Sequence, residues 1–305
     1  MPLSGCVLRS CLPHTFSEAA GCMHGRILPQ DLAGCLWYKI SLFDGNHMQQ
    51  EFFMHNVGFI GLGTMGTPMA WNIHRAGFRL GVSNRSAEKC SVFAGEGIGV
   101  FESPADLAQW ADIVIIMVFG PEALMEVLGG PGGAARSMAA GKTVINMSTV
   151  SREVTLAAQE LVSSCGASFL DAPVAGSKKP AQDGSLTILA GGSPDVLERV
   201  RPVLACLGKV IIHCGQVGAG TDMKLFINVL LGTLMQSFAE ALTLGTSFGL
   251  RLADMLAAVK NSAVACPMFS VKGTAISSGN FEKNFPVELI FKDLNLALQA
   301  AGREH

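Results

Sequence analysis

Three glycines at a fixed spacing give this sequence its first sign of chemistry. Gly61, Gly63 and Gly66 form a G-x-G-x-x-G pattern directly after the apolar run 56–60. The first glycine of such a pattern permits a tight turn, the second lets the backbone approach a pyrophosphate, and the third lets the following helix pack closely on the strand. The pattern predicts a dinucleotide-binding turn, with an ordinary glycine turn as the other interpretation. The residues of this predicted turn are Gly61, Leu62, Gly63, Thr64, Met65 and Gly66.

The residues after the next predicted strand bear on which dinucleotide binds. An Asp or Glu at this point would accept a hydrogen bond from the adenosine ribose 2′-OH. The sequence has Asn84, Arg85 and Ser86 instead, so no carboxylate is present there to repel a 2′-phosphate. Guanidinium and hydroxyl groups are good hydrogen-bond donors to phosphate. These three residues therefore favour NADP over NAD, the other interpretation being that Arg85 is a solvated loop charge.

Strands and helices alternate around this turn, as a dinucleotide-binding fold requires. Apolar residues recur at helical spacing from Met69 to Gly77, and a second strand is predicted at Arg79–Ser83. Continuous apolar runs such as 113–118 are typical of parallel strands that are covered on both faces. Further strands are expected at 99–101, 113–119, 143–147, 168–172, 186–190 and 209–213, and helices at 104–110, 122–128, 134–139, 152–165 and 194–207.

After Gly220 the strand pattern stops and every segment is predicted to be helical. The expected fold class is α/β: a Rossmann-type doubly wound domain that binds NADP at residues 54–217, followed by an all-α domain at 218–305. Residues 1–53 have no sustained periodicity and no complete targeting signal, so we expect a disordered extension that arises from a start codon placed too far upstream.

Composition excludes several classes of protein. Of 305 residues, 49% are apolar and 15% are charged, with a net charge of −2, which argues against disorder throughout and against a nucleic-acid partner. The apolar stretch Leu225–Ala239 is interrupted by polar residues, so we expect a buried helix and no membrane partner. The nine cysteines include no CxxC pair, which predicts no metal site and indicates a reducing, cytoplasmic location.

Four motifs occur in an order that resembles the β-hydroxyacid dehydrogenase family. They are the glycine turn 61–66, the stretch 171–177 (DAPVAGS), the stretch 218–228 (GAGTDMKLFIN) and the pair Lys292-Asp293. The resemblance extends from about residue 55 to the end. The continuation after Ser177 and the turn 84–86 resemble the glyoxylate and succinic semialdehyde reductase branch, which implies NADPH-dependent reduction of a small aldehyde acid, and a homo-oligomer.

Lys224 matches the catalytic lysine of that family. Hydride delivered to an aldehyde carbon leaves a negative oxygen, which a positioned ammonium can stabilise and protonate. Burial at a domain junction would lower the pKa of this lysine towards the range that proton transfer needs. Asn228 lies one helical turn further and shares a face with Lys224, so we expect it to orient Lys224 or to bind the substrate. A surface lysine at a helix start is the other interpretation.

The resemblance also implies residues that contact the substrate and the nicotinamide. Thr149 matches a position beside both, although it could instead be the N-cap of the helix from Arg152, and we expect Val118 to contact the cofactor. The stretch 172–177 resembles a substrate loop. Ala175 stands where the family usually has Ser, which leaves only the backbone N–H groups of Ala175 and Gly176 as donors.

Positions near the C-terminus complete the implied site. Phe285 and Asp293 match substrate-side positions, and Lys292 matches one that reaches the cofactor; a solvated helix surface is the other interpretation for Lys292 and Asp293. Asp293 is expected to hold Lys224 or a cofactor hydroxyl. Family members continue past the equivalent of Arg303, so we expect an incomplete helical domain. The apolar face then left exposed would consist of Leu294, Leu296, Leu298 and their neighbours.

Three functions follow from these expectations. The first is NADPH-dependent reduction of glyoxylate or succinic semialdehyde, with Lys224 as the general acid. The second is an NAD-dependent 3-hydroxyisobutyrate dehydrogenase, which Arg85 and the missing acidic residue disfavour. The third is a truncated dinucleotide-binding pseudoenzyme, against which the presence of Lys224 argues.

Overall fold

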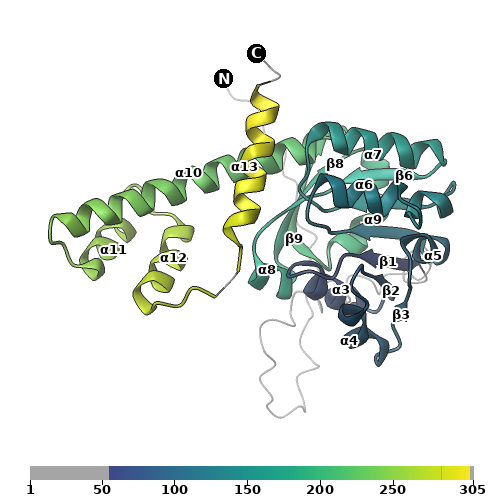
Figure 1. The fold of residues 1–305 in the computed structure, drawn as a ribbon, viewed down its shortest axis with the longest axis horizontal. Helices are drawn as coiled ribbons and strands as arrows, with labels where there is room; N and C mark the ends of the chain where they lie inside the picture. Colours follow the sequence, from purple (N-terminus) through teal and green to yellow (C-terminus); the bar gives the residue numbers. More distant parts are fainter. Residues whose placement is uncertain (1–54, 283, 303–305) are drawn as a thin grey trace, which may run out of the picture. The chain divides into compact units, whose positions relative to one another are not determined.

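A computed structural model of the chain describes residues 55–282 and 284–302. The expectations for residues 1–53 lie outside this part of the chain. The described residues form a Rossmann-type α/β sheet followed by a helical region, as the sequence predicted (Figure 1).

The sheet begins with the strand order that is typical of dinucleotide-binding folds. Six strands pair in parallel in the order β3-β2-β1-β4-β5-β6. Beyond them β8 pairs antiparallel with β6 and β7, and parallel with β9. The strands are β1 (Asn56–Ile60), β2 (Arg79–Ser83), β3 (Gly99–Val100), β4 (Ile113–Ile116), β5 (Thr143–Asn146), β6 (Ser168–Asp171), β7 (Val174–Ala175), β8 (Leu186–Gly191) and β9 (Gly208–Gly215).

Helices connect these strands and then form the C-terminal region. Helices up to α9 belong to the sheet region, whereas α10 to α13 follow it (Figure 1). They are α3 (Gly66–Arg75), α4 (Ser91–Ala94), α5 (Pro104–Trp110), α6 (Pro121–Gly129), α7 (Arg152–Ser164), α8 (Lys178–Gln182), α9 (Pro194–Leu204), α10 (Ala219–Ser247), α11 (Leu252–Lys260), α12 (Pro267–Ser278) and α13 (Val287–Ala301), with 3-10 turns η2 (Ala87–Cys90) and η3 (Ala134–Ser137).

The sheet is covered on both faces by apolar side chains. On β4, Ile113 and Ile115 belong to one core cluster, while Val114 and Ile116 belong to the other. This alternation follows from the two-residue period of a strand, and it explains why the whole run is apolar. Because these strands are parallel, their carboxyl ends lie at one edge of the sheet, where ligands bind in such folds.

Several element predictions need correction. The strand expected at 113–119 ends at Ile116, because the N–H of Val118 donates to Ser148 Oγ (2.9 Å) instead of to a neighbouring strand. The helix expected at 134–139 is the short 3-10 turn η3. The sequence reading also missed β7 and α8, which are too short to show a period.

The long apolar segment does not form the buried helix that we expected. Helix α10 has 29 residues, and among its apolar side chains only Leu225 and Phe238 are buried, whereas several large ones, Phe226 among them, are exposed. By length and composition alone it is the one helix of the described residues that could cross a membrane. Apolar composition predicted burial, but no described element covers most of this helix.

Helix α13 packs against α10. The exposed apolar face that we expected around Leu294, Leu296 and Leu298 is therefore covered in part. Leu296 is buried, and Leu294 packs so closely on α10 that a Cβ on Gly232 would lie 3.0 Å from its Cδ1. Leu298 alone of the three leucines is exposed. The three side chains therefore do not form one exposed face.

Candidate active site

The glycine turn after β1 has the conformation that its spacing predicts. Gly61 has φ of 101°, which favours glycine, and a Cβ there would collide with the carbonyl oxygen of Met117. A Cβ on Gly66 would collide with the carbonyl oxygen of Gly61, so the start of α3 lies directly against the turn. A Cβ on Gly63 would meet nothing within 4 Å, which leaves its backbone open to a ligand.

A cavity of about 430 Å³ lies beside this turn and collects many of the predicted cofactor residues. It is lined by Gly61, Gly63, Asn84, Arg85, Ser86 and Val118, together with Ile60, Ser83, Lys89, Glu102, Phe119, Glu126 and others. Leu62, Thr64, Met65, Gly66, Thr149 and Lys292 were also expected to bind the cofactor but are not among its lining residues.

Asn84 lines the cavity and binds the backbone of two segments. Its Oδ1 accepts a hydrogen bond from the N–H of Leu62 (2.9 Å), and its Nδ2 donates to the carbonyl of Ser86 (3.0 Å). The side chain of Leu62 points into the apolar core. Asn84 therefore joins the glycine turn to the basic turn after β2.

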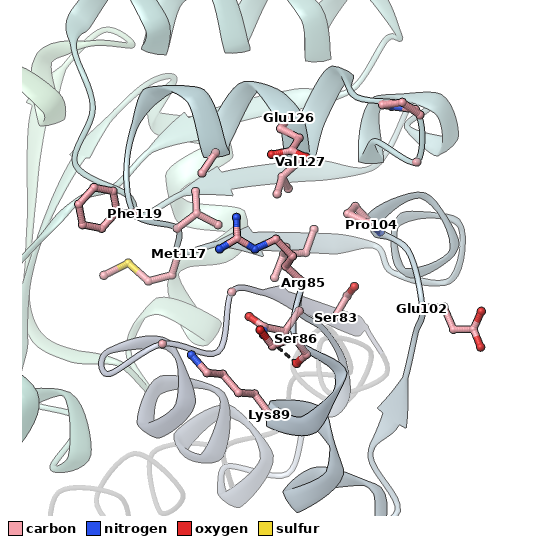
Figure 2. Close-up of a pocket in the computed structure, with 18 residues that line it drawn as sticks. Ser83, Arg85, Ser86, Lys89, Glu102, Pro104, Met117, Phe119, Glu126 and Val127 are labelled. Carbon is pink, nitrogen blue, oxygen red and sulfur yellow. Dashed lines mark hydrogen bonds between the residues drawn. The ribbon is translucent and has the colours of Figure 1, made fainter.

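Lys89 is a cavity residue that the sequence reading missed. It lies on η2, four residues after Arg85. Figure 2 shows Arg85 and Lys89 reaching into the cavity, whereas Glu102 points away from Arg85 at the other side. The signal was available, because a second basic residue in the same short segment after the strand could have been read together with Arg85.

A second group of polar side chains is buried where α10 meets α13. Lys224 is 7% exposed, and Asn228 and Asp293 are buried as well. Asn228 Nδ2 donates to Asp293 Oδ2 (2.6 Å), and Lys292 Nζ donates to Asp293 Oδ1 (2.6 Å). The carboxylate of Asp293 thus holds Asn228 and Lys292, and no hydrogen bond joins it to Lys224 in the part of the chain that the structure describes.

The pKa of Lys224 is lowered from its ordinary value of 10.5 to about 8. Burial is the main cause, since desolvation disfavours the ammonium. Asp293 acts in the opposite direction, and Lys292 lowers the pKa of Lys224 further. Lys224 can therefore exchange a proton near neutral pH, as the sequence analysis expected of a buried lysine.

The side chain of Asn228 lacks one of its hydrogen-bond partners. Its Oδ1 is buried and has no hydrogen-bond partner among the described residues. A buried polar atom without a partner is costly, so such an atom often marks a place where a ligand binds. This acceptor lies one helical turn from Lys224, on the same side of α10.

Lys292 connects this buried group to the wall of the cavity. Its Nζ donates to the carbonyl of Thr149 (2.7 Å), and it lies 5.9 Å from the ring centroid of Phe119, a cavity residue.

The alternative role of Thr149 as a helix cap is wrong, because Ser151 caps α7 by accepting from the N–H of Val154 (3.3 Å).

The remaining predicted substrate residues lie in two short segments, at 175–176 and at Phe285. Ala175 belongs to β7 and pairs with Thr187 of β8, so part of the expected loop is a strand. Gly176 has φ of 137°, and a Cβ there would lie 2.7 Å from Leu186, which explains the glycine. Phe285 is half-buried in the segment before α13.

Comparison with known proteins defines the class of this chain. Residues 56–215 match the family model for the NAD binding domain of 6-phosphogluconate dehydrogenase, and residues 218–305 match that for the NAD-binding region of NADP-dependent 3-hydroxyisobutyrate dehydrogenase. Fold and site thus define a nicotinamide dinucleotide-dependent oxidoreductase. The chain belongs to the β-hydroxyacid dehydrogenase family.

Individual relatives agree with this assignment. The chain is 39% identical to glyoxylate/succinic semialdehyde reductase 1 of Arabidopsis thaliana, over 82% of this chain and 86% of the relative. It is 37% identical to 2-(hydroxymethyl)glutarate dehydrogenase of Eubacterium barkeri, over 81% and 82%. The solved structure of Mycobacterium tuberculosis 3-hydroxyisobutyrate dehydrogenase with L-serine is 29% identical, covers 82% of this chain and 88% of that one, and has a TM-score of 0.76.

The residues of the cavity fit a nicotinamide dinucleotide. The turn leaves the backbone of Gly63 open where a pyrophosphate would approach, and the start of α3 follows it directly. Val118 and Phe119 line the side of the cavity that leads towards Lys292. When bound, the cofactor supplies the hydride that this family transfers.

Proposed function

We propose that this protein reduces a small aldehyde acid, glyoxylate or succinic semialdehyde, with NADPH, and that Lys224 is the general acid. The observation that carries the proposal is the buried Lys224 with its pKa near 8, one helical turn from the unpartnered Oδ1 of Asn228. The activities for which the Arabidopsis and Eubacterium relatives are named support a substrate that bears a carboxylate.

Lys224 would act on the oxygen of the substrate. As hydride reaches the aldehyde carbon, negative charge develops on that oxygen, and the ammonium of Lys224 stabilises the charge and then gives up a proton. A pKa near 8 leaves most of the lysine protonated at neutral pH, yet makes proton loss much easier than from an ordinary lysine.

Asn228 would bind the same part of the substrate. Asp293 accepts from the Nδ2 of Asn228, and this hydrogen bond leaves the buried Oδ1 of Asn228 without a partner among the described residues. That oxygen can accept from the ammonium of Lys224 or from the hydroxyl of the product. Asp293 and Lys292 would then keep both groups in place, since Lys292 also binds the carbonyl of Thr149.

The preference for NADP rests on the basic turn after β2. Arg85, Ser86 and Lys89 line one side of the cavity, and the strand end holds no carboxylate to accept from a ribose 2′-OH. Two cationic side chains and a hydroxyl would bind a 2′-phosphate more tightly than a free ribose.

The substrate carboxylate would be bound by groups around β7. We assign it to the backbone of Ala175 and Gly176, with Thr149 beside the reacting carbon and Phe285 on the apolar side. This assignment is supported by the motif order in the sequence and by the proximity of β7 to α10.

The test is steady-state turnover by the purified full chain. NADPH oxidation with glyoxylate and succinic semialdehyde should be fast, and Lys224→Ala should lower kcat by about 10²- to 10⁴-fold while the Kd for NADPH stays nearly constant. An active Lys224→Ala variant would refute the role of Lys224. NADPH binding by the wild-type chain without any turnover would favour the pseudoenzyme.

A second candidate substrate is 3-hydroxyisobutyrate, oxidised with NAD. It is favoured by the similarity to the Mycobacterium tuberculosis dehydrogenase. The same assay run in the direction of oxidation separates the two, because a higher kcat/KM for 3-hydroxyisobutyrate with NAD than for either aldehyde acid with NADPH would replace our proposal.

We also propose that the protein is a homo-oligomer in a reducing, cytoplasmic setting. The exposed apolar side chains of α10, such as Phe226 (59% exposed) and Leu230 (50%), support association. The free thiols of Cys90, Cys165, Cys214 and Cys266 support the reducing setting. Light scattering at the mass of a single chain would contradict the oligomer.

A further inference from the structure

Asp171 is a fully buried carboxylate that the proposed chemistry does not use. It is the last residue of β6, at the edge where ligands bind, and it is 0% exposed. Its Oδ1 accepts from the N–H of Gly218 (2.8 Å), and its Oδ2 accepts from the N–H (2.8 Å) and Oγ1 (3.1 Å) of Thr221. All three donors belong to the start of α10.

These contacts supply the cap that α10 lacks in its own sequence. Gly218 is the N-cap residue and has no side chain, while its φ of 97° favours glycine. In a capping box, one side chain accepts from the N–H of the third helical residue and another from the N–H of the N-cap residue. The two oxygens of Asp171 accept from both of these N–H groups, 47 and 50 residues along the chain from Asp171.

The surrounding residues leave room for this carboxylate and orient its donor. A Cβ on Gly191 would collide with Asp171 Oδ1, and one on Gly220 would lie 3.0 Å from Asp171 Oδ2. Thr155 Oγ1 on α7 lies 2.9 Å from Thr221 Oγ1, so Thr155 can donate to Thr221 while Thr221 donates to Asp171. Burial raises the pKa of Asp171, whereas the hydrogen bonds from Gly218 and Thr221 act in the opposite direction.

This arrangement determines where Lys224 lies. Lys224 follows Thr221 by three residues, less than one helical turn, and most of the buried residues of α10 lie between Gly220 and Asn228. Beyond Asn228 the helix is largely exposed, so packing of that part does little to fix the position of the first turn. Arg152 of α7 pairs with Asp222 on the exposed side, where an ion pair contributes less.

We propose that Asp171 is a positioning residue for Lys224: it fixes the first turn of α10 to the carboxyl end of β6 and so holds the ammonium in its working position. This inference rests on the proposed function of Lys224. A shift of about 1 Å in a reacting group can cost about 10²-fold in rate, so the loss of this cap should appear in catalysis before it appears in cofactor binding.

The test uses Asp171→Asn in the full chain. The amide offers one acceptor oxygen, and its NH₂ group faces an N–H donor, so one of the two backbone contacts is lost. We expect kcat to fall by about 10- to 100-fold, with the Kd for NADPH within about twofold of wild type. Thr221→Val is a milder second variant if Asp171→Asn does not fold, and it should lower kcat by about 3- to 10-fold.

A double-mutant cycle with Lys224→Ala separates positioning from general destabilisation. If Asp171 acts through Lys224, Asp171→Asn and Thr221→Val should have little further effect on kcat in the Lys224→Ala background. Independent, multiplying losses would overturn the inference while leaving the proposed role of Lys224 intact. A Lys224→Ala variant with wild-type kcat would instead overturn the proposed function itself.

The matched control is Lys142→Met, which removes a comparable cap elsewhere. Lys142 Nζ donates to the carbonyls of Ala108, Gln109 and Ala111 at the end of α5. This variant should lower the melting temperature and leave kcat unchanged. If it lowers kcat as much as Asp171→Asn does, the effect of Asp171 is general stability and the inference fails.

Discussion

Asn228 and Asp293 are 65 residues apart in the sequence and share a buried hydrogen bond of 2.6 Å. This bond joins α10 to α13 and leaves the Oδ1 of Asn228 as the free acceptor beside Lys224. The charge of Asp293 also raises the pKa of Lys224 against the effect of burial. One carboxylate therefore influences both the orientation of an amide and the protonation of a lysine.

Asp293→Asn should shift the pH profile of the reaction to lower pH. Without the carboxylate, burial and Lys292 act on Lys224 unopposed, so its pKa falls below about 8. The alkaline limb of kcat/KM should move down by about one pH unit. Glu288→Gln, an exposed carboxylate on the same helix, is the control and should not move it. An unshifted profile for Asp293→Asn would count against this coupling.

The wild-type profile itself should report the protonation of Lys224. Reduction needs the ammonium, so kcat/KM with aldehyde and saturating NADPH should be constant below about pH 8 and fall as pH rises through that value. Oxidation of the hydroxy acid needs the neutral amine and should rise over the same range. Activity in the reduction direction that persists up to pH 10 would exclude Lys224 as the acid.

Lys224→Met should stabilise the protein while abolishing turnover. Because the pKa of Lys224 is lower in the folded chain, its charge destabilises the fold below about pH 8, and this penalty is relieved as pH rises from 8 towards 10.5. The difference between these two pKa values corresponds to about 3 kcal/mol at pH 7. Urea unfolding should show that Lys224→Met has a higher free energy of unfolding than the wild type at pH 7. This difference should be smaller at pH 10. The exposed Lys260→Met is the control, expected to change stability by less than about 0.5 kcal/mol.

Arg85→Asp should narrow or reverse the preference for NADPH over NADH. The new carboxylate would repel a 2′-phosphate and accept from a ribose hydroxyl, so the ratio of the two Kd values should change by at least about 10-fold. Fluorescence titration measures both values. Arg79 begins the strand that Arg85 follows and lies exposed at its other end, so Arg79→Asp should leave both Kd values unchanged. Equal Kd values for the two cofactors in the wild type would refute the preference.

Ala175→Ser should restore a hydroxyl beside the proposed carboxylate site. Ala175 is half-buried at the end of β7, where one added oxygen can be solvated. If the substrate binds there, KM for glyoxylate or succinic semialdehyde should fall by about 3- to 10-fold. Ala139→Ser, at an exposed position, serves as the control. No change in kcat/KM for either substrate would mean that the substrate does not contact β7.

Features that depend on residues close together in the chain could be predicted from the sequence. The glycine spacing at 61–66, the alternation of strands and helices and the basic turn at Arg85 are local patterns, because a turn or an element needs only neighbouring residues. The position of Lys224 early in a helix was also visible from the sequence, as was its face shared with Asn228.

The groups that are far apart in the chain and meet in the fold could not be predicted from the sequence. The contacts of Asp171 with the start of α10 and of Asp293 with Asn228 depend on the order of strands and on the packing of α13, which no local pattern encodes. The exposure of α10 was predicted wrongly for the same reason, since burial requires a covering element and apolar composition does not supply one. The pKa of Lys224 likewise follows from how closely the chain surrounds it, because desolvation is a property of the fold and not of the residue.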